Sequence, residues 1–203
     1  VVHLSIGNVD EAINCFDAAL QIIHQDEDAE LSVKCYVGKA QSLEKKDDIE
    51  KAIQCIEKGI DLYPQNSMGH FQKGDLHEIK NEYDQALKCF QKAIELNDRD
   101  PDGYNRKGLI FHELQLYLEA LECFEQAIEV APTEAESNGN KGATLLALGD
   151  YPQALHFLDK AIEYGEPDAE YYQNKAVALQ ALNHIDSALQ NCQMAMKIDP
   201  EDE

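Results

Sequence analysis

The sequence has few basic residues and no long apolar run. Its 203 residues include 17 Lys and Arg against 39 Asp and Glu, a formal net charge of −22. Nucleic acids and anionic membrane surfaces are bound through clustered cations, so this charge argues against both as partners. No stretch approaches the ~20 apolar residues of a membrane-spanning helix. Hydrophobic residues make up 44% of the chain, which is enough for a packed interior, so we expect a folded protein.

Site-forming motifs are also lacking. The six cysteines form no C-x-x-C pair, and the chain shows no nucleophile–base, phosphate-loop or metal-ligand spacing. His70 and His77 replace aromatic positions of the pattern described below, so we interpret them as packing residues. We therefore predict no catalytic residues, no metal and no cofactor. N-glycosylation sequons and a signal-peptide pattern are missing as well, and we expect free thiols in a reducing, intracellular (cytoplasmic) compartment.

The sequence repeats itself every 34 residues. The dipeptide Lys-Gly recurs at that spacing, beginning at Lys73, Lys107 and Lys141. The period defines five contiguous units: 33–66, 67–100, 101–134, 135–168 and 169–202. Positions 8 and 27 of the unit are small and position 20 is always Ala, whereas larger apolar residues recur at positions 17, 21, 24 and 28. This spacing predicts two amphipathic helices per unit, with turn residues such as Asn81 and Gly149 between them.

The 34-residue pattern, with small residues at positions 8, 20 and 27 and Pro near position 32, resembles the tetratricopeptide repeat. The resemblance implies an all-α fold, a right-handed superhelical α-solenoid of antiparallel helix pairs. Ala12, Phe16 and Ala19 match positions 20, 24 and 27. Residues 1–32 are therefore expected to hold a partial repeat and an acidic link at 26–28. Because Val1 would fall inside a helix, we expect one solenoid domain that is part of a longer chain.

In this family the first helix of each pair lines a concave groove, and positions 2, 5, 6, 9, 12 and 13 face the ligand. Position 6 reads Gly38, Gln72, Arg106, Asn140 and Asn174. A carboxamide both donates and accepts hydrogen bonds, so it can hold the backbone of an extended peptide. The arrangement is similar to the asparagine ladder of the O-linked N-acetylglucosamine transferase repeats and of the peroxisomal targeting-signal receptor. The alternative is that these amides only solvate an exposed helix face.

The edge of the expected groove is acidic in the last three units. Position 2 carries the acids Asp102, Glu136 and Glu170. We predict a preference for a basic peptide or partner segment, although acids in a first helical turn also favour the helix dipole. Position 5 is expected to add contacts through Phe71, Asn105 and Gln173. Gly139 at the same position predicts a gap, either a hinge or a pocket.

Position 7 is Lys in all five units: Lys39, Lys73, Lys107, Lys141 and Lys175. Position 29 is acidic in four units, as Asp61, Glu95, Glu129 and Glu163. We expect the lysines to pair with these acids, or to extend their stems along the helix pair. The alternative is a cationic track for an acidic ligand.

These residues predict a non-catalytic scaffold that binds an extended peptide or partner segment. The clamp by which chaperone-binding repeats hold a C-terminal carboxylate is absent, because Asp102 stands where a Lys is needed. One alternative is the interaction arm of a larger enzyme, such as a glycosyltransferase or ubiquitin-ligase subunit. Another is self-association through exposed terminal helices. Charge varies from zero in unit 33–66 to −5 in unit 101–134, which points to a basic partner in the C-terminal half.

Overall fold

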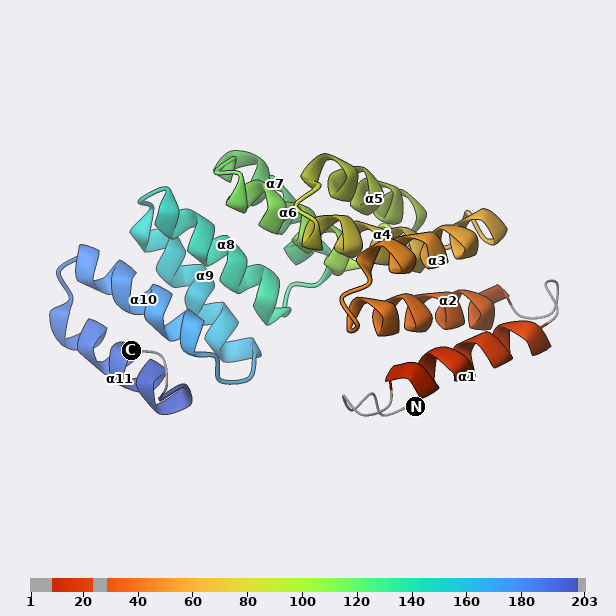
Figure 1. Cartoon of the computed structure of the whole chain (residues 1–203). Coiled ribbons are helices and arrows are strands. Elements are labelled where there is room, and N and C mark those ends of the chain that lie inside the picture. Colours follow the sequence, from red (N-terminus) through yellow and green to blue (C-terminus); the bar gives the residue numbers. More distant parts are fainter. Residues whose placement is uncertain (1–8, 24–28, 201–203) are drawn as a thin grey trace. The chain divides into compact units, whose positions relative to one another are not determined.

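The computed structural model describes residues 9–23 and 29–200. The acidic link at 26–28 and the start of the partial repeat lie outside the described residues. The described part consists of α-helices and contains no strand. The helices are α1 (Val9–Ile22), α2 (Ala29–Glu44), α3 (Ile49–Leu62), α4 (Ser67–Ile79), α5 (Tyr83–Leu96), α6 (Pro101–Glu113), α7 (Tyr117–Val130), α8 (Ala135–Ala147), α9 (Tyr151–Tyr164), α10 (Ala169–Ala181) and α11 (Ile185–Ile198) (Figure 1).

The helices form antiparallel pairs within two compact units. The N-terminal unit, Val1–Asp98, contains α1 to α5, and the C-terminal unit, Arg99–Glu203, contains α6 to α11. Each first helix packs on the second helix of its repeat: α2 on α3, α4 on α5, α6 on α7, α8 on α9, and α10 on α11. The predicted all-α solenoid class of helix pairs is therefore confirmed. The expectation of one solenoid domain stays a prediction.

The turn inside each repeat has the same left-handed residue at position 15. Asp47, Asn81, Gln115 and Asn183 have φ between 56° and 63°, and Gly149 has φ of 79°. One residue later, a backbone N–H bonds to the carbonyl of position 11, as in the bond from Leu116 to Phe111 at 2.8 Å. This bond is the 6→1 contact of a helix C-cap, which needs a residue that tolerates positive φ.

Small residues at position 8 let the two helices of a repeat approach closely. A Cβ added at Gly108 would lie 2.5 Å from the Phe124 ring, and one at Gly74 would lie 2.6 Å from the Phe90 ring. Both phenylalanines are fully buried at position 24. The small residue at position 8 and the large residue at position 24 therefore lie in close contact between the paired helices.

Candidate functional site

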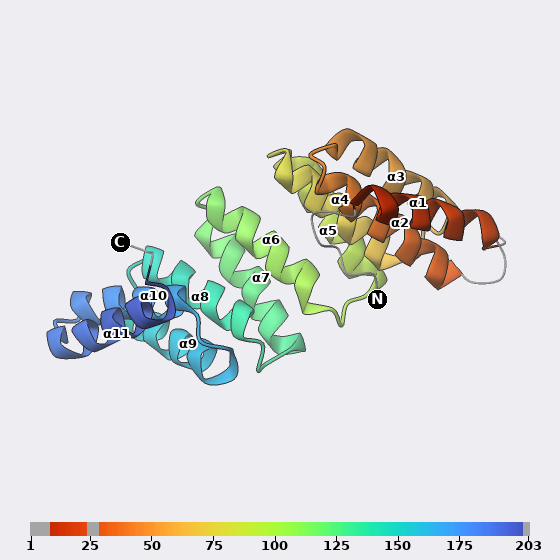
Figure 2. The same cartoon turned by 60° about the horizontal axis from the view of Figure 1, so that its bottom comes forward.

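The first helices of the C-terminal unit lie side by side. Helix α8 packs between α6 and α10, and Figure 2 shows the three in a row. Positions 2, 5 and 6 of these helices and the residue before each helix form what we call the first-helix face. Its residues are Asp100, Asp102, Asn105, Arg106, Glu134, Glu136, Gly139, Asn140, Asp168, Glu170, Gln173 and Asn174.

One position-6 side chain of this face bonds to the neighbouring first helix. Arg106, Asn140 and Asn174 are all partly exposed. The Nδ2 of Asn140 donates a hydrogen bond to the Oδ1 of Asn105, 3.1 Å away on the neighbouring helix. Asn105 itself is only 2% exposed. It therefore links α6 to α8 from beneath the face and does not present a free amide.

A second polar contact joins α6 and α8 near the C-terminal ends of the two helices. The Nδ1 of His112 lies 2.9 Å from the hydroxyl of Thr144, and that hydroxyl donates to the backbone oxygen of Asn140 at 2.8 Å. Because the hydroxyl hydrogen is already used, the imidazole Nδ1–H is the donor to Thr144. Burial lowers the pKa of His112, and the Glu170 carboxylate opposes that shift. Sequence reasoning did not single out this pair, although His112 falls at the ligand-facing position 12.

Carboxylates gather where α6, α8 and α10 begin. Asp100 accepts a hydrogen bond from the Asp102 backbone N–H at 3.2 Å, and Asp168 accepts one from the Glu170 backbone N–H at 2.9 Å. The Ser137 hydroxyl donates to Glu134. Asp100 and Asp168 therefore cap the N-termini of α6 and α10, whereas Glu134 makes no such bond to the backbone of α8. The helix-dipole alternative for the position-2 acids stays a prediction. Asp100, Glu134 and Asp168 were missed, although position 34 is acidic in all three units.

The acids of neighbouring helices repel one another. Burial raises the pKa of Asp102, the Asp100 carboxylate adds to the rise, and Arg106 opposes it. Burial also raises the pKa of Glu134, with further contributions from Glu136, Asp102 and Asp100. The face therefore holds negative charge that a bound cation would stabilise.

The expected gap at Gly139 is filled. A Cβ at this position would lie 2.3 Å from Cε1 of Tyr171 on the next first helix, so the absence of a side chain admits the Tyr171 ring. Gly139 is buried and α8 continues through it without a break. Asn138, fully buried, donates to the backbone oxygen of Glu134 at 2.7 Å. The prediction of a pocket was wrong, because a side chain from the next repeat occupies the space; the alternative of a hinge stays a prediction.

In the N-terminal unit, the groove residues expected at positions 5 and 6 are engaged in packing. Gln72 is 5% exposed and accepts a hydrogen bond from the Nε2 of Gln41 at 2.9 Å. The Phe71 ring packs edge-on against Phe90, with centroids 5.4 Å apart. Gln72 thus joins α2 to α4 much as Asn105 joins α6 to α8.

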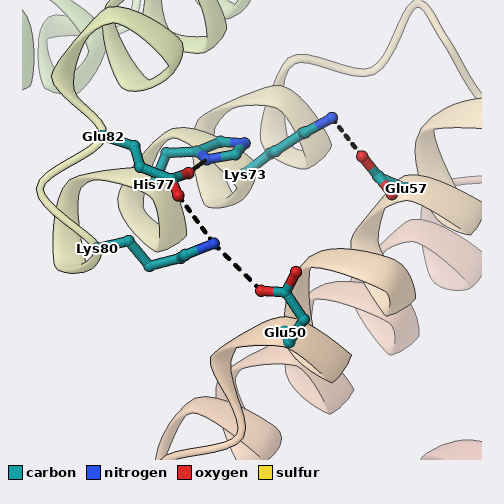
Figure 3. Close-up of polar contacts among 6 residues, drawn as sticks. All are labelled: Glu50, Glu57, Lys73, His77, Lys80 and Glu82. Atoms are coloured by element: carbon teal, nitrogen blue, oxygen red, sulfur yellow. Dashed lines mark hydrogen bonds and ion pairs between the residues drawn. The ribbon is translucent and has the colours of Figure 1, made fainter.

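A network of charged side chains connects α3, α4 and α5 (Figure 3). The Nζ of Lys80 lies 3.2 Å from Glu50 and 2.9 Å from Glu82, and Glu82 also contacts the Nδ1 of His77 at 2.7 Å. The Lys80 ammonium, and then His77, lower the pKa of Glu82. His77 is therefore a bonded packing residue, as the sequence indicated.

The lysines at position 7 pair differently from the prediction. Lys73 contacts Glu57 at 2.7 Å, and Lys141 contacts Glu125 at 2.9 Å (Figure 3 for Lys73). Lys39 also pairs with Asp17, and Lys175 pairs with Asp159 at 2.6 Å.

Every one of these acids is at position 25 of the preceding repeat, so the expected pairing with position 29 of the same unit was wrong. In these four pairs the lysine at position 7 faces the preceding second helix, and each pair joins two repeats. Lys141 is 8% exposed, and its Nζ also lies 4.2 Å from the Phe157 ring centroid. Lysines that are paired and largely covered argue against a cationic track.

Metal-binding clusters, reactive thiols and membrane-spanning helices are three features that could give the described residues a further role. No cluster of three or more His, Cys, Asp or Glu that could hold a metal ion occurs there. All six cysteines are free thiols, and burial raises the pKa of Cys35, Cys55, Cys89 and Cys123, which keeps these thiols protonated. In residues 9–23 and 29–200, no helix has the length and apolarity needed to cross a bilayer.

Family models agree with the period found in the sequence. Models described as tetratricopeptide repeat match residues 33–66, 102–166 and 140–203, and one described as TPR repeat matches residues 74–115. No curated protein sequence matches the chain.

Several solved structures share the fold at low identity. YrrB, titled a TPR protein with an unusual peptide-binding site, is 21% identical, with 92% of this chain and 93% of that chain covered and a TM-score of 0.67. Pseudomonas aeruginosa pilF is 17% identical over 84% of this chain and 78% of that chain, with a TM-score of 0.78. A chain of the APC/C hetero-tetramer Cut9-Hcn1 is 15% identical over 96% of this chain and 38% of that chain, with a TM-score of 0.74. At these identities the likeness concerns the fold alone.

Proposed function

Because the chain belongs to the tetratricopeptide repeat family, we propose that it is a non-catalytic scaffold that binds an extended, basic segment of a partner protein. The tetratricopeptide fold suggests protein–protein interaction, and a solved relative of the fold is described as having a peptide-binding site. We place the binding surface on the first-helix face of the C-terminal unit.

The observation that carries this proposal is the set of mutually repelling carboxylates on that face. Glu134 is affected by Glu136, Asp102 and Asp100, so acids from two helices lie within electrostatic reach of one another. A Lys or Arg of the ligand would relieve this repulsion. Residues 101–202 hold six basic and 18 acidic residues, so the surrounding charge attracts the same partner.

Amides beside the acids would hold the peptide backbone. Asn140 and Asn174 are partly exposed and one period apart on adjacent helices, with Arg106 and Gln173 beside them. Asn105 contributes indirectly, because it accepts the hydrogen bond that orients Asn140. Gln72 and Phe71 would have the same indirect role in the N-terminal unit, where they support α4.

The test is fluorescence anisotropy with a labelled peptide of alternating lysine and alanine, which places its cations on one side when extended. The variants are Glu136→Gln/Glu170→Gln and Asn140→Ala/Asn174→Ala. We expect the acid variant to weaken binding about tenfold, since it removes two charges that face the ligand. The amide variant should weaken binding of both this peptide and an uncharged analogue.

The matched control is Glu119→Gln/Glu122→Gln, two exposed acids on the second helix α7. It changes the net charge by the same amount and should leave the affinity within about twofold. Equal weakening by the control would mean that net charge alone attracts the peptide. Unchanged binding by the amide variant would eliminate Asn140 and Asn174 as backbone contacts.

A second candidate function is the interaction arm of a larger enzyme. The match to the Cut9-Hcn1 chain favours it, since the matched part is only 38% of that longer chain. Sequencing the complete reading frame decides between an arm and a separate scaffold. For either, we propose a reducing cytoplasmic location, which the six free thiols support.

A further inference from the structure

The N-terminal unit contains a groove on the side of its second helices. Helix α2 lies between α1 and α3 (Figure 1), and the three helices enclose a groove of about 490 Å³. Its apolar lining comes from Ile13, Leu20 and Leu43, and its charged lining from Lys39, Lys51, Lys58 and Asp17. We call it the lysine groove.

The lysine groove is basic in a strongly acidic chain. Lys39 is paired with Asp17, so the excess positive charge comes from Lys51 and Lys58. Lys51 contacts Asp48, which does not line the groove, and the Lys51 side chain is 69% exposed. Such an exposed pair is weak, and a carboxylate from a ligand can compete for the ammonium.

The corresponding positions of the other repeats have no such excess. The groove is formed by positions 25 and 29 of one repeat and positions 7, 19 and 26 of the next. These five positions carry a charge of +2 in the lysine groove and 0 or −1 in every later repeat. One reason is Gln21, which occupies position 29, where the next four second helices have Asp61, Glu95, Glu129 and Glu163.

We propose that the lysine groove binds an acidic segment of a partner protein, with carboxylates on Lys51 and Lys58 and an apolar side chain between them. The two lysines are seven residues apart on α3, which places them on one side of the helix about 10 Å apart. A polyproline II segment repeats every three residues at about 3.1 Å each, so acids three apart match this distance. Ile13, Leu20 and Leu43 receive the intervening apolar residue.

This surface is separate from the proposed basic-peptide site. It lies in the N-terminal unit and involves the second helices α1 and α3, whereas the basic-peptide site uses first helices of the C-terminal unit. One chain would therefore hold an acidic segment on one unit and a basic segment on the other. Substitutions in one site should leave binding at the other site unchanged.

The test uses the full chain and a fluorescein-labelled peptide of sequence Glu-Pro-Leu-Glu-Pro-Leu-Glu, measured by fluorescence anisotropy. We expect Lys51→Glu/Lys58→Glu to weaken binding about tenfold or more, and Gln21→Glu to weaken it about threefold, because it restores the acid of the other repeats. The matched control is Lys88→Glu/Lys197→Glu, two exposed lysines outside the groove, with the same change in net charge. It should stay within about twofold of wild type.

Three outcomes overturn the proposal: no binding by wild type, equal weakening by the control variant, or equal affinity for the analogue with Gln in place of Glu. A fourth such outcome, measured by light scattering, is a wild-type dimer that dissociates on Lys51→Glu/Lys58→Glu. It would assign the groove to a second copy of this chain. Circular dichroism of each variant should match wild type, since all the substituted side chains are exposed.

Discussion

The amide of Asn140 on α8 and the side-chain oxygen of Asn105 on α6 are joined by a hydrogen bond of 3.1 Å. The two residues are one period and one position apart, so the bond runs from one repeat to the next. Asn105 is buried and Asn140 is partly exposed. One partner thus stabilises the packing of two first helices while the other is oriented at the surface.

Replacing Asn105 should affect stability more than replacing an exposed amide. Asn105→Ala removes a buried acceptor and leaves the Asn140 amide with one partner fewer, so we expect the free energy of unfolding to fall by about 1–3 kcal/mol. Urea denaturation followed by circular dichroism measures it. Asn174→Ala, at a partly exposed site, should change it by less than about 0.5 kcal/mol. Similar effects of the two substitutions would contradict the structural role of Asn105.

Gly139→Ala should destabilise the C-terminal unit even though alanine favours helices. The new Cβ would lie 2.3 Å from the Tyr171 ring, and such overpacking destabilises by about 1–3 kcal/mol. In a Tyr171→Ala background the same substitution should be neutral or stabilising by up to about 1 kcal/mol, because only the helix propensity remains. A double-mutant cycle by thermal denaturation tests this, and additive effects would rule out the contact.

Gln115→Gly should raise the free energy of unfolding. Gln115 has φ of 60° in the turn between α6 and α7, a conformation that a residue with a Cβ adopts at a cost of about 1–2 kcal/mol. Glycine avoids this strain but loses more backbone entropy, and we expect a net gain of about 0.5 kcal/mol. Gln126→Gly, on the exposed side of α7, should instead destabilise by about 1 kcal/mol. Chemical denaturation compares the two variants, and a loss of stability in both would show that the backbone at Gln115 is not strained.

Stability should fall at alkaline pH in part through Tyr171. Burial, followed by the carboxylates of Asp168 and Glu136, raises the pKa of Tyr171 from 10.0 to about 12. The folded state therefore keeps the proton while the unfolded chain releases it. The contribution of Tyr171 is fully present below pH 10.0 and declines as pH rises from there towards 12.

Tyr171→Phe isolates this effect, since it keeps the ring and removes the ionisable group. Between pH 9 and 11.5, the variant should lose less stability than wild type, measured by thermal denaturation at each pH. Identical slopes for the two proteins would show that Tyr171 ionises normally in the folded state.

Much of the fold follows from the local sequence. The 34-residue period, the helix pairs and most turns could be predicted, because amphipathic spacing and left-handed turn residues are properties of short segments. Gln115 was not predicted as a turn residue, since nothing in its side chain favours positive φ. There the geometry is imposed by the flanking helices and by the helix-ending bond from Leu116 to Phe111.

The candidate site was predictable only in part. The repeat positions singled out the acids Asp102, Glu136 and Glu170, whose role in binding stays a prediction, but not the second row formed by Asp100, Glu134 and Asp168. Amides at positions 5 and 6 were both expected to contact the ligand, yet Asn105 is buried whereas Asn140 and Asn174 are partly exposed. The burial of a side chain depends on how its helix packs against the neighbouring helices.

The sequence by itself determined the repeat, its helices and the distribution of charge, because each of these is set by residues close together in the chain. Only the tertiary structure decided which side chains meet between repeats: Lys141 with Glu125, and the Tyr171 ring at Gly139. A period specifies that position 7 faces a neighbouring helix, but the rotation and offset of the two helices decide whether it meets position 25 or position 29. That choice rests on the packing of many side chains at once, and no single segment contains it.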